Sequence, residues 1–279
     1  TAGNVGDTDG NVYVGYNAGY SNISGSGLTM LGFKAGQNAT GSYNTYVGYR
    51  AGQGTGGAAS TTGDHNTGVG YEVLKATTSG YRNTTLGYKA GVGVTTGYSN
   101  VLIGYEAAEG ISSGYENVVM GANPSQANLQ KSTLIGFNAG KEGTAHNVVA
   151  VGYKALGAGT LTTDANGTVA IGYEAGKAIT SGQYNTMVGY LAGNVITTGD
   201  KNTLFGYQAG GGANGVDTLS DNTFMGYQAG LKIDSGARNT AIGSQAMESS
   251  AADSDANDSV AIGNRALYSL SDGDNNIAI

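Results

Sequence analysis

The sequence predicts an all-β fold, a parallel β-solenoid or β-roll of about 15 to 16 coils. Glycine is the first reason, since the 279 residues include 51 glycines and one proline. The second is that one glycine recurs in fifteen similar copies, at intervals of 15 to 22 residues, most often 17. We call these the anchor glycines and number other positions from them: Gly15, Gly32, Gly48, Gly70, Gly87, Gly104, Gly121, Gly136, Gly152, Gly172, Gly189, Gly206, Gly226, Gly243 and Gly263.

The residues before each anchor are the third reason, because they alternate with a period of two. Offset −1 is always apolar, and offset −3 is always β-branched, as at Val12, Thr45 and Val101. Such residues favour a strand, and these two offsets share one of its faces, which we expect to face the core. The predicted core residues at offset −1 include Val14, Val47, Leu86, Ile103, Ile171, Val188, Ile242 and Ile262.

Three further offsets carry a preferred residue type. Offset +1 is aromatic in twelve of fifteen copies, offset +3 is alanine in thirteen, and offset −4 is asparagine in most. We expect an aromatic ladder at +1, a close approach of backbones at +3, within the chain or between chains, and stacked turns at −4. The ladder either packs within the assembly or contacts glycans, and its tyrosines include Tyr16, Tyr49, Tyr88, Tyr105, Tyr173, Tyr190, Tyr207 and Tyr227.

A second glycine lies between the anchors, in segments such as 94–97 and 179–182. Each such segment begins with valine or isoleucine, and we expect it to form a second short strand, which gives two strands per coil. Residues 53–65 and 213–221 lengthen their intervals and are predicted loop insertions. Two strands and two turns within about 17 residues make one coil.

Composition excludes several classes of function. A net charge of −7 and a pI near 4.7 argue against a nucleic-acid binder. No apolar run has the length of a membrane span, and there is no cysteine to form a disulfide or thiolate metal site. The last repeat stops at residues 276–279, before its glycine. We therefore interpret 1–279 as one continuous tandem-repeat segment of a longer chain.

Motifs that suggest chemistry are weak. Residues 210–215 match G-x-G-x-x-G without a βαβ context, so a flexible insertion is the better interpretation. Residues 253–258 begin like a calcium loop but have Asp258 in place of the required glycine, so we expect a solvated turn rather than a surface calcium site. His65 and His146 have no metal-ligand spacing. We predict no catalytic residue, no cofactor site and no metal site, and hence no enzyme.

The repeat resembles a known class of surface fibres. Residues 259–266 read SVAIGNRA and residues 168–175 read TVAIGYEA, which resemble the head repeats of trimeric autotransporter adhesins. The commoner N-T-x-x-G-Y-x-A-G, as in 202–210, is similar to repeats of phage tail fibres and bacterial surface fibres. The resemblance covers essentially the whole chain. It implies a left-handed parallel β-roll assembled as a homotrimer, with offsets −3 and −1 inside.

These observations favour a structural and adhesive role. About two large apolar residues per coil are few for a stable monomer, so we expect self-association into a trimeric rod. The expected function is an extracellular fibre segment, on a cell surface or a virion, which holds a surface for a glycan or protein receptor. One alternative is a subunit of a filament that polymerises end to end. Another is a solenoid that binds ice or a glycan through threonine at offset −3, although that column is expected to face inward.

Overall fold

The computed structural model describes residues 10–55, 61–124, 128–141, 143–158, 161–162, 165–212, 218–249, 254–270 and 273–279. These residues form short β-strands joined by turns, and they contain no α-helix. The chain divides into two compact units, Thr1–Ile135 and Gly136–Ile279. We describe each unit by itself.

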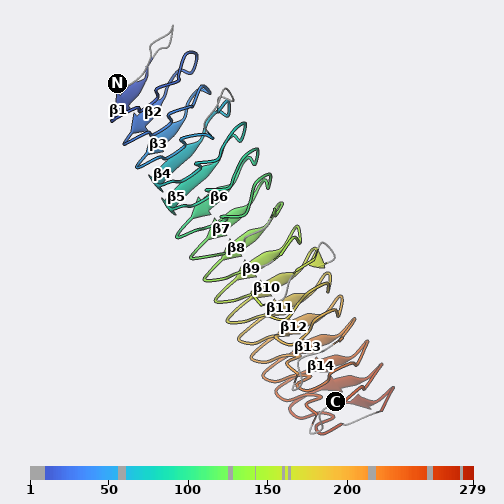
Figure 1. Ribbon diagram of the computed structural model, residues 1–279. Coiled ribbons are helices and arrows are strands. Elements are labelled where there is room, and N and C mark those ends of the chain that lie inside the picture. The colour runs from blue at the N-terminus through green and yellow to red at the C-terminus, as the bar shows by residue number, and fades with distance from the viewer. Residues whose placement is uncertain are drawn as a thin grey trace. The chain divides into compact units, whose positions relative to one another are not determined.

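Within each unit, every strand pairs in parallel with the next strand along the chain (Figure 1). The first unit contains β1 (Val12–Val14), β2 (Thr29–Leu31), β3 (Thr45–Val47), β4 (Thr67–Tyr71), β5 (Thr84–Tyr88), β6 (Val101–Ile103), β7 (Val118–Met120) and β8 (Thr133–Ile135). The second contains β9 (Val149–Val151), β10 (Val169–Ile171), β11 (Thr186–Val188), β12 (Thr203–Phe205), β13 (Thr223–Met225), β14 (Thr240–Ile242), β15 (Val260–Ile262) and β16 (Ile277–Ala278). The predicted all-β parallel solenoid is thus confirmed.

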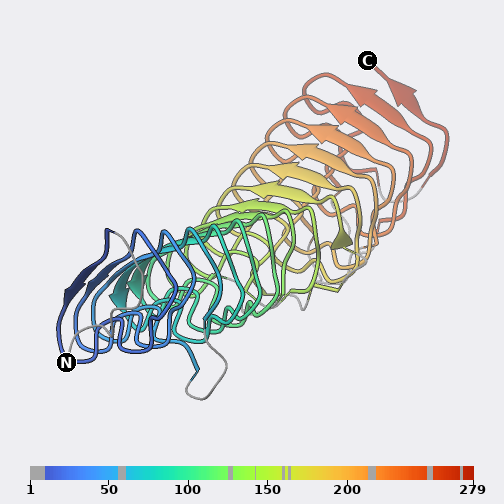
Figure 2. The same ribbon diagram turned by 90° about the horizontal axis from the view of Figure 1, so that it is seen from above.

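Pairing is in register with the repeat. Thr84 of β5 lies opposite Val101 of β6, and Leu86 lies opposite Ile103, so equal offsets from the anchor become neighbours. The strands of successive coils lie side by side along each unit (Figure 2). Every position of the repeat therefore forms a column in which a side chain meets its counterpart from the next coil.

The prediction of two strands per coil is wrong for the described residues. Each coil has one strand, and the segment around the second glycine contributes only isolated bridges, such as Tyr98 with Tyr115 and Ile233 with Ser254. Turns there satisfy the backbone by other bonds, since the amide nitrogens of Thr95, Thr96 and Gly97 all donate to the carbonyl of Ser112. One acceptor shared by three donors is turn geometry rather than a ladder.

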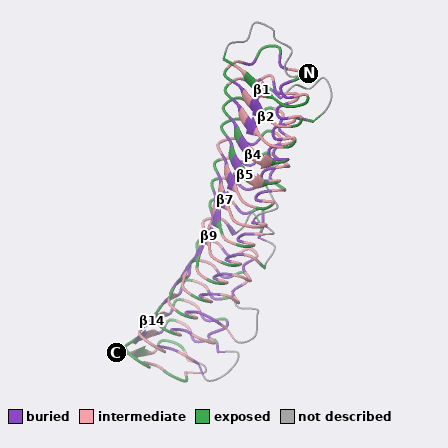
Figure 3. Cartoon of the chain, turned by 90° about the vertical axis from the view of Figure 1, so that its left-hand side faces the viewer, coloured by how far each residue is buried: buried purple, intermediate pink, exposed green. Residues whose placement is uncertain are grey.

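The prediction that offsets −3 and −1 face the core is also wrong. Offset −2 is the buried one, as with Met30, Leu102 and Phe224. Figure 3 shows buried positions along labelled strands such as β4 and β5. The predicted core residues lie on the outer face of the sheet, with exposed fractions of 53% for Val14 and 49% for Leu86. Of the others, Ile171, Ile242 and Ile262 are exposed, and Val47, Ile103 and Val188 are half-buried.

The reason lies in which other columns share the inner face. Asparagine at −4 has the same strand parity as offset −2, and Asn83, Asn100 and Asn202 are fully buried. Alanine at +3 is fully buried in its own chain in every copy except the half-buried Ala266, which corrects the expectation that this column also mediates contact between chains. Aliphatic residues of the second turn, such as Ile111 and Ile196, complete the inside. Apolar residues at −1 are therefore surplus to the core of one chain.

The buried asparagines form a hydrogen-bonded column along the coils. Asn100 donates from Nδ2 to the Asn83 Oδ1 at 2.9 Å and to the Gly114 carbonyl at 2.9 Å. Its own Oδ1 accepts from the backbone and the side chain of Asn117. Because both polar atoms of each amide are satisfied, the side chains can be buried without a large desolvation penalty.

The anchor glycines have two independent requirements. Gly87 has φ of +136°, a conformation that L side chains rarely adopt. A Cβ atom placed on it would also collide with the carbonyl group of Gly104 in the next coil. The same collision recurs from one anchor to the next, so only glycine allows the coils to approach this closely.

Comparing Gly87→Ala with Gly210→Ala separates these two requirements. Gly210 has φ of +57°, but the nearest atoms to a Cβ atom placed there belong to the flexible Leu204 side chain, at 2.9 Å. Its substitution should therefore lower the free energy of unfolding by about 1–3 kcal/mol, mainly through backbone strain. Gly87→Ala should lower it further or prevent folding, because the colliding atoms are backbone. Urea unfolding followed by circular dichroism measures both, and equal losses would contradict the role of close approach.

Asn100→Leu should destabilise the protein by several kcal/mol, because two buried backbone groups lose their partners at about 1–3 kcal/mol each. Asn100→Ser is the matched control. Serine occupies the same column at Ser259, where its Oγ accepts from the Asn276 amide at 3.0 Å. We expect Asn100→Ser to retain more than half of the stability that Asn100→Leu loses, and thermal unfolding of the two variants gives the comparison.

Candidate functional site

The outer face of the sheet carries two adjoining columns, which we call the apolar stripe: the residues at offsets −3 and −1. None of the described stripe residues is buried, and large aliphatic or aromatic side chains such as Leu31, Phe205 and Met225 are 42–54% exposed. Neither column contains a charged residue in any of the fifteen copies. The −1 column is apolar throughout and the −3 column consists of threonine and valine. An exposed row of apolar side chains like that at −1 marks a candidate interaction site.

Beside the stripe, the aromatic residues at offset +1 form the predicted ladder. In the first unit the rings stack from Tyr16 through Phe33 and Tyr49 to Tyr105, with centroids 5.1–5.4 Å apart. In the second unit six rings stack from Phe137 to Tyr227, with centroids 4.9–5.5 Å apart. The expected aromatic ladder is therefore confirmed in both units.

Stacking determines how these rings can be contacted. Interplanar angles of 4–10° along the second unit's ladder mean that each ring face lies against the next ring. Even so, the rings remain exposed, from 41% at Tyr153 to 50% at Tyr227. An external ligand therefore meets ring edges and phenolic hydroxyls along the ladder, rather than ring faces.

Residues at offset +2 flank the ladder with charge. The cationic groups of Lys34, Arg50, Lys89 and Lys154 each lie over the preceding aromatic ring, 5.0–5.6 Å from its centroid. Such contacts contribute about 0.5–1 kcal/mol at exposed positions. They hold the long side chains against the ladder.

The structure also contains a second, shorter ladder that the sequence patterns did not predict. Tyr81, Tyr98 and Tyr115 stack at 4.9–5.0 Å with interplanar angles of 2°. They lie at offset −6, on the other side of the apolar stripe. A signal was present in the sequence, because each follows a second glycine directly, in the pairs at 80–81, 97–98 and 114–115.

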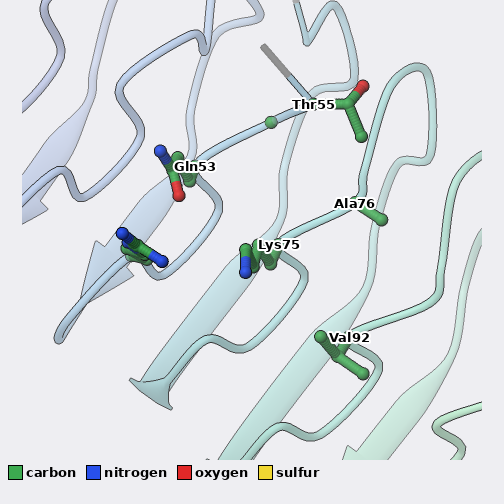
Figure 4. A pocket seen from close by; sticks show the side chains of 7 residues that line it. Gln53, Thr55, Lys75, Ala76 and Val92 are labelled. Atoms are coloured by element: carbon green, nitrogen blue, oxygen red, sulfur yellow. The ribbon is translucent and has the colours of Figure 1, made fainter.

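One groove in the first unit has a volume of about 490 Å³ (Figure 4). Its cations are already engaged, because Glu72 Oε1 binds Lys75 Nζ at 2.9 Å and Arg50 Nη1 at 3.3 Å. The two cations share this single carboxylate, so the groove keeps one net positive charge. The lining residues are Arg50, Gln53, Gly54, Thr55, Lys75, Ala76 and Val92.

Other suspected sites do not gather ligands. His65 is exposed and tilts against Tyr43, with ring centroids 5.0 Å apart, while the backbone amide of His146 donates to Asn166. Within the described residues, no three His, Cys, Asp or Glu side chains could hold a metal ion. Parts of the calcium-like segment 253–258 and of the glycine-rich segment 210–215 lie outside those residues.

Comparisons with known proteins identify no family for this chain. No protein-family model matches the chain, and no curated protein matches it. Among the described residues, no helix is long and apolar enough to cross a membrane. The columns of the solenoid are therefore the basis on which a function can be inferred.

The pKa of Glu72 provides a test of the ion pairs beside the groove. Burial alone would raise this pKa, but hydrogen bonds and charges from Lys75 and Arg50 outweigh it and hold the pKa below its ordinary value of 4.5. A lowered folded-state pKa adds stability that is present above 4.5 and is lost as pH falls through the folded-state value.

Glu72→Gln should therefore reduce the stability at neutral pH by about 1–2 kcal/mol. The gap between the native chain and the variant should close as the solution is acidified below the ordinary carboxyl pKa. Thermal unfolding measured across that range tests this, and a gap that stays constant with pH would contradict the ion-pair account.

Proposed function

We propose that this chain is a structural and adhesive fibre segment, which self-associates through the apolar stripe as a homotrimer and presents its remaining surface for attachment. The single observation that carries the proposal is the exposed row of apolar side chains at offset −1, one per coil. Full burial of one such side chain contributes about 1.5–3 kcal/mol. Covering the stripe thus supplies stability that the core of one chain lacks.

The surroundings of the stripe have the anatomy of a protein interface. Its centre is apolar and uncharged, and the tyrosine ladders lie on either side. Charged residues occur farther out, at offsets +2 and −5, as at Lys89 and Arg82. Interfaces commonly have an apolar, charge-depleted centre enriched in aromatic residues and a polar rim.

A second copy of this chain is the partner that best fits the stripe. The apolar side chains repeat once per coil, because every strand pairs in register with the next. Only a partner with the same axial period can place an apolar group opposite each of them. Symmetric association of identical chains is also the commonest form of oligomer. The number three and a left-handed roll come from the resemblance to trimeric autotransporter adhesin heads.

The location and the mechanical role follow from the same proposal. A fibre of this kind works outside the cell, on a bacterial surface or on a virion, where it holds its surface away from an anchor. Repeated weak contacts along the coils then add up to avidity for a glycan or protein receptor. The segment requires no catalytic residue, cofactor or metal for this role.

A second candidate function gains support from one observation. The threonine column at offset −3 faces outward, and Thr186 and Thr203 are exposed, so the expectation that this column faces inward is wrong. A regular row of hydroxyl and methyl groups could bind ice. On this alternative, Thr186→Val with Thr203→Val would abolish ice binding, whereas a fibre interface would tolerate the change.

Charged substitutions in the stripe test the self-association. Leu86→Asp combined with Ile103→Asp should convert a trimer to monomers, because each places an unpaired charge in the centre of the interface. Ile23→Asp is the matched control, since Ile23 is 66% exposed and lies outside the stripe. Multi-angle light scattering gives the mass of each. A native chain that is a stable monomer would overturn the proposal, and large polymers would favour the end-to-end filament instead.

A further inference from the structure

The hydroxyl groups of the second unit's ladder are not used by the fold. Tyr190, Tyr207 and Tyr227 make no hydrogen bond through their hydroxyls to any part of the chain that the structure describes, although each is 42–50% exposed. The ladder therefore presents a row of free hydroxyl groups, one from each coil. Because a phenolic hydroxyl both donates and accepts, the row can bind a ligand rich in hydroxyl groups.

Side chains beside this row are uncharged. Offset +2 next to the three tyrosines is occupied by Leu191, Gln208 and Gln228. The Gln228 amide donates to Gln208 Oε1 at 3.0 Å, so the two glutamine side chains are linked from one coil to the next. Two amides and no charge beside the row of phenols suit a neutral polar ligand, and the net charge of −7 disfavours a polyanion.

The spacing of the ladder restricts the ligand further. Successive ring centroids from Tyr173 to Tyr227 are 4.9, 5.3 and 5.2 Å apart. An extended β-1,4-linked polysaccharide advances by nearly the same distance per sugar. Each coil then faces one sugar. Because successive sugars in such a chain face opposite ways, equivalent sugar groups recur at every second coil, whereas ligands of another period lose register after a few coils.

We propose that the tyrosine ladder of the second unit, from Tyr190 to Tyr227, binds an extended, neutral, β-1,4-linked polysaccharide with one sugar per coil. The sugar hydroxyls bond to the phenolic hydroxyls and to the flanking glutamine amides, while the stacked rings keep this row straight. This inference rests on the proposed attachment role and names the class of receptor.

Binding of cello-oligosaccharides of increasing length to the native chain is the first test, measured by isothermal titration calorimetry. Each added sugar should tighten binding by about threefold, since one net hydrogen bond contributes roughly 0.5–1.5 kcal/mol. The gain should continue until the ladder is covered. Affinity that stops rising after one or two sugars, or no binding at any length, would overturn the proposal.

Replacing the hydroxyls alone is the second test. Tyr190→Phe, Tyr207→Phe and Tyr227→Phe together keep the stacked rings and should weaken binding of a long cello-oligosaccharide by more than tenfold. The same change at Tyr81, Tyr98 and Tyr115 is the matched control and should leave binding unchanged. Equal loss in both triple variants, or no loss in the first, would contradict the assignment.

Two further measurements separate this inference from the proposed function. Light scattering on the Tyr190, Tyr207 and Tyr227 variant should give the mass of the native assembly, so that loss of binding is not loss of association. Thr186→Val with Thr203→Val should keep the sugar binding, because the site is the ladder and not the threonine column. Binding that persists in a monomeric chain would reject the trimer and keep the polysaccharide site.

Discussion

Contact between consecutive anchor glycines sets the distance at which the coils stack. All anchors have a positive φ, and within each unit an anchor lies so close to the carbonyl of the next anchor that a side chain cannot fit between them. Parallel pairing with short β-strands, an in-register column for each offset and stacked rings near 5 Å all depend on that close approach. A single geometric requirement, repeated in every coil, thus determines the positions of the core, the stripe and the ladders.

Columns create a problem for charged residues, because each side chain meets its counterpart from the next coil. In this chain the charges at such a position alternate in sign from coil to coil. At offset −5 the sequence runs Lys201, Asp221, Arg238 and Asp258, and the last two form a bidentate pair with distances of 2.6 and 2.7 Å. Such exposed pairs contribute little stability individually. Their alternation does disfavour a wrong pairing in which a coil stacks on the next coil but one, because that pairing would bring like charges together.

Much of this fold could be predicted from the sequence, because offsets from one glycine carry the information. The strand positions, parallel stacking and aromatic ladder all follow from residue types at fixed spacing. Which face of the strand points toward the core could not be predicted in the same way. Apolar residues at −1 suggest an inner face, yet Leu102 and Phe224 at −2 lie inside, with the buried asparagines. An apolar residue at a fixed offset predicts burial, but the sequence pattern is the same whether the residue packs in the core of its own chain or against another molecule.

The candidate site was also predictable only in part. The ladder from Phe137 to Tyr227 was predictable from repeated aromatics after the anchor, but its freedom for contact depends on ring orientation. The ladder of Tyr81, Tyr98 and Tyr115 spans only three coils, so it is lost against a repeat that spans fifteen. A ladder of three rings can be recognised only in the structure, where the three side chains are seen to stack.

The in-register columns also make each coil interchangeable with the others. Removing or duplicating one whole coil leaves each remaining residue opposite a residue of the same offset, so both the core and the outer face survive the change. Recombination between repeats in the gene could therefore lengthen or shorten the protein in steps of one coil. A solenoid built this way can change its length over generations while its lateral surface keeps the same columns of side chains.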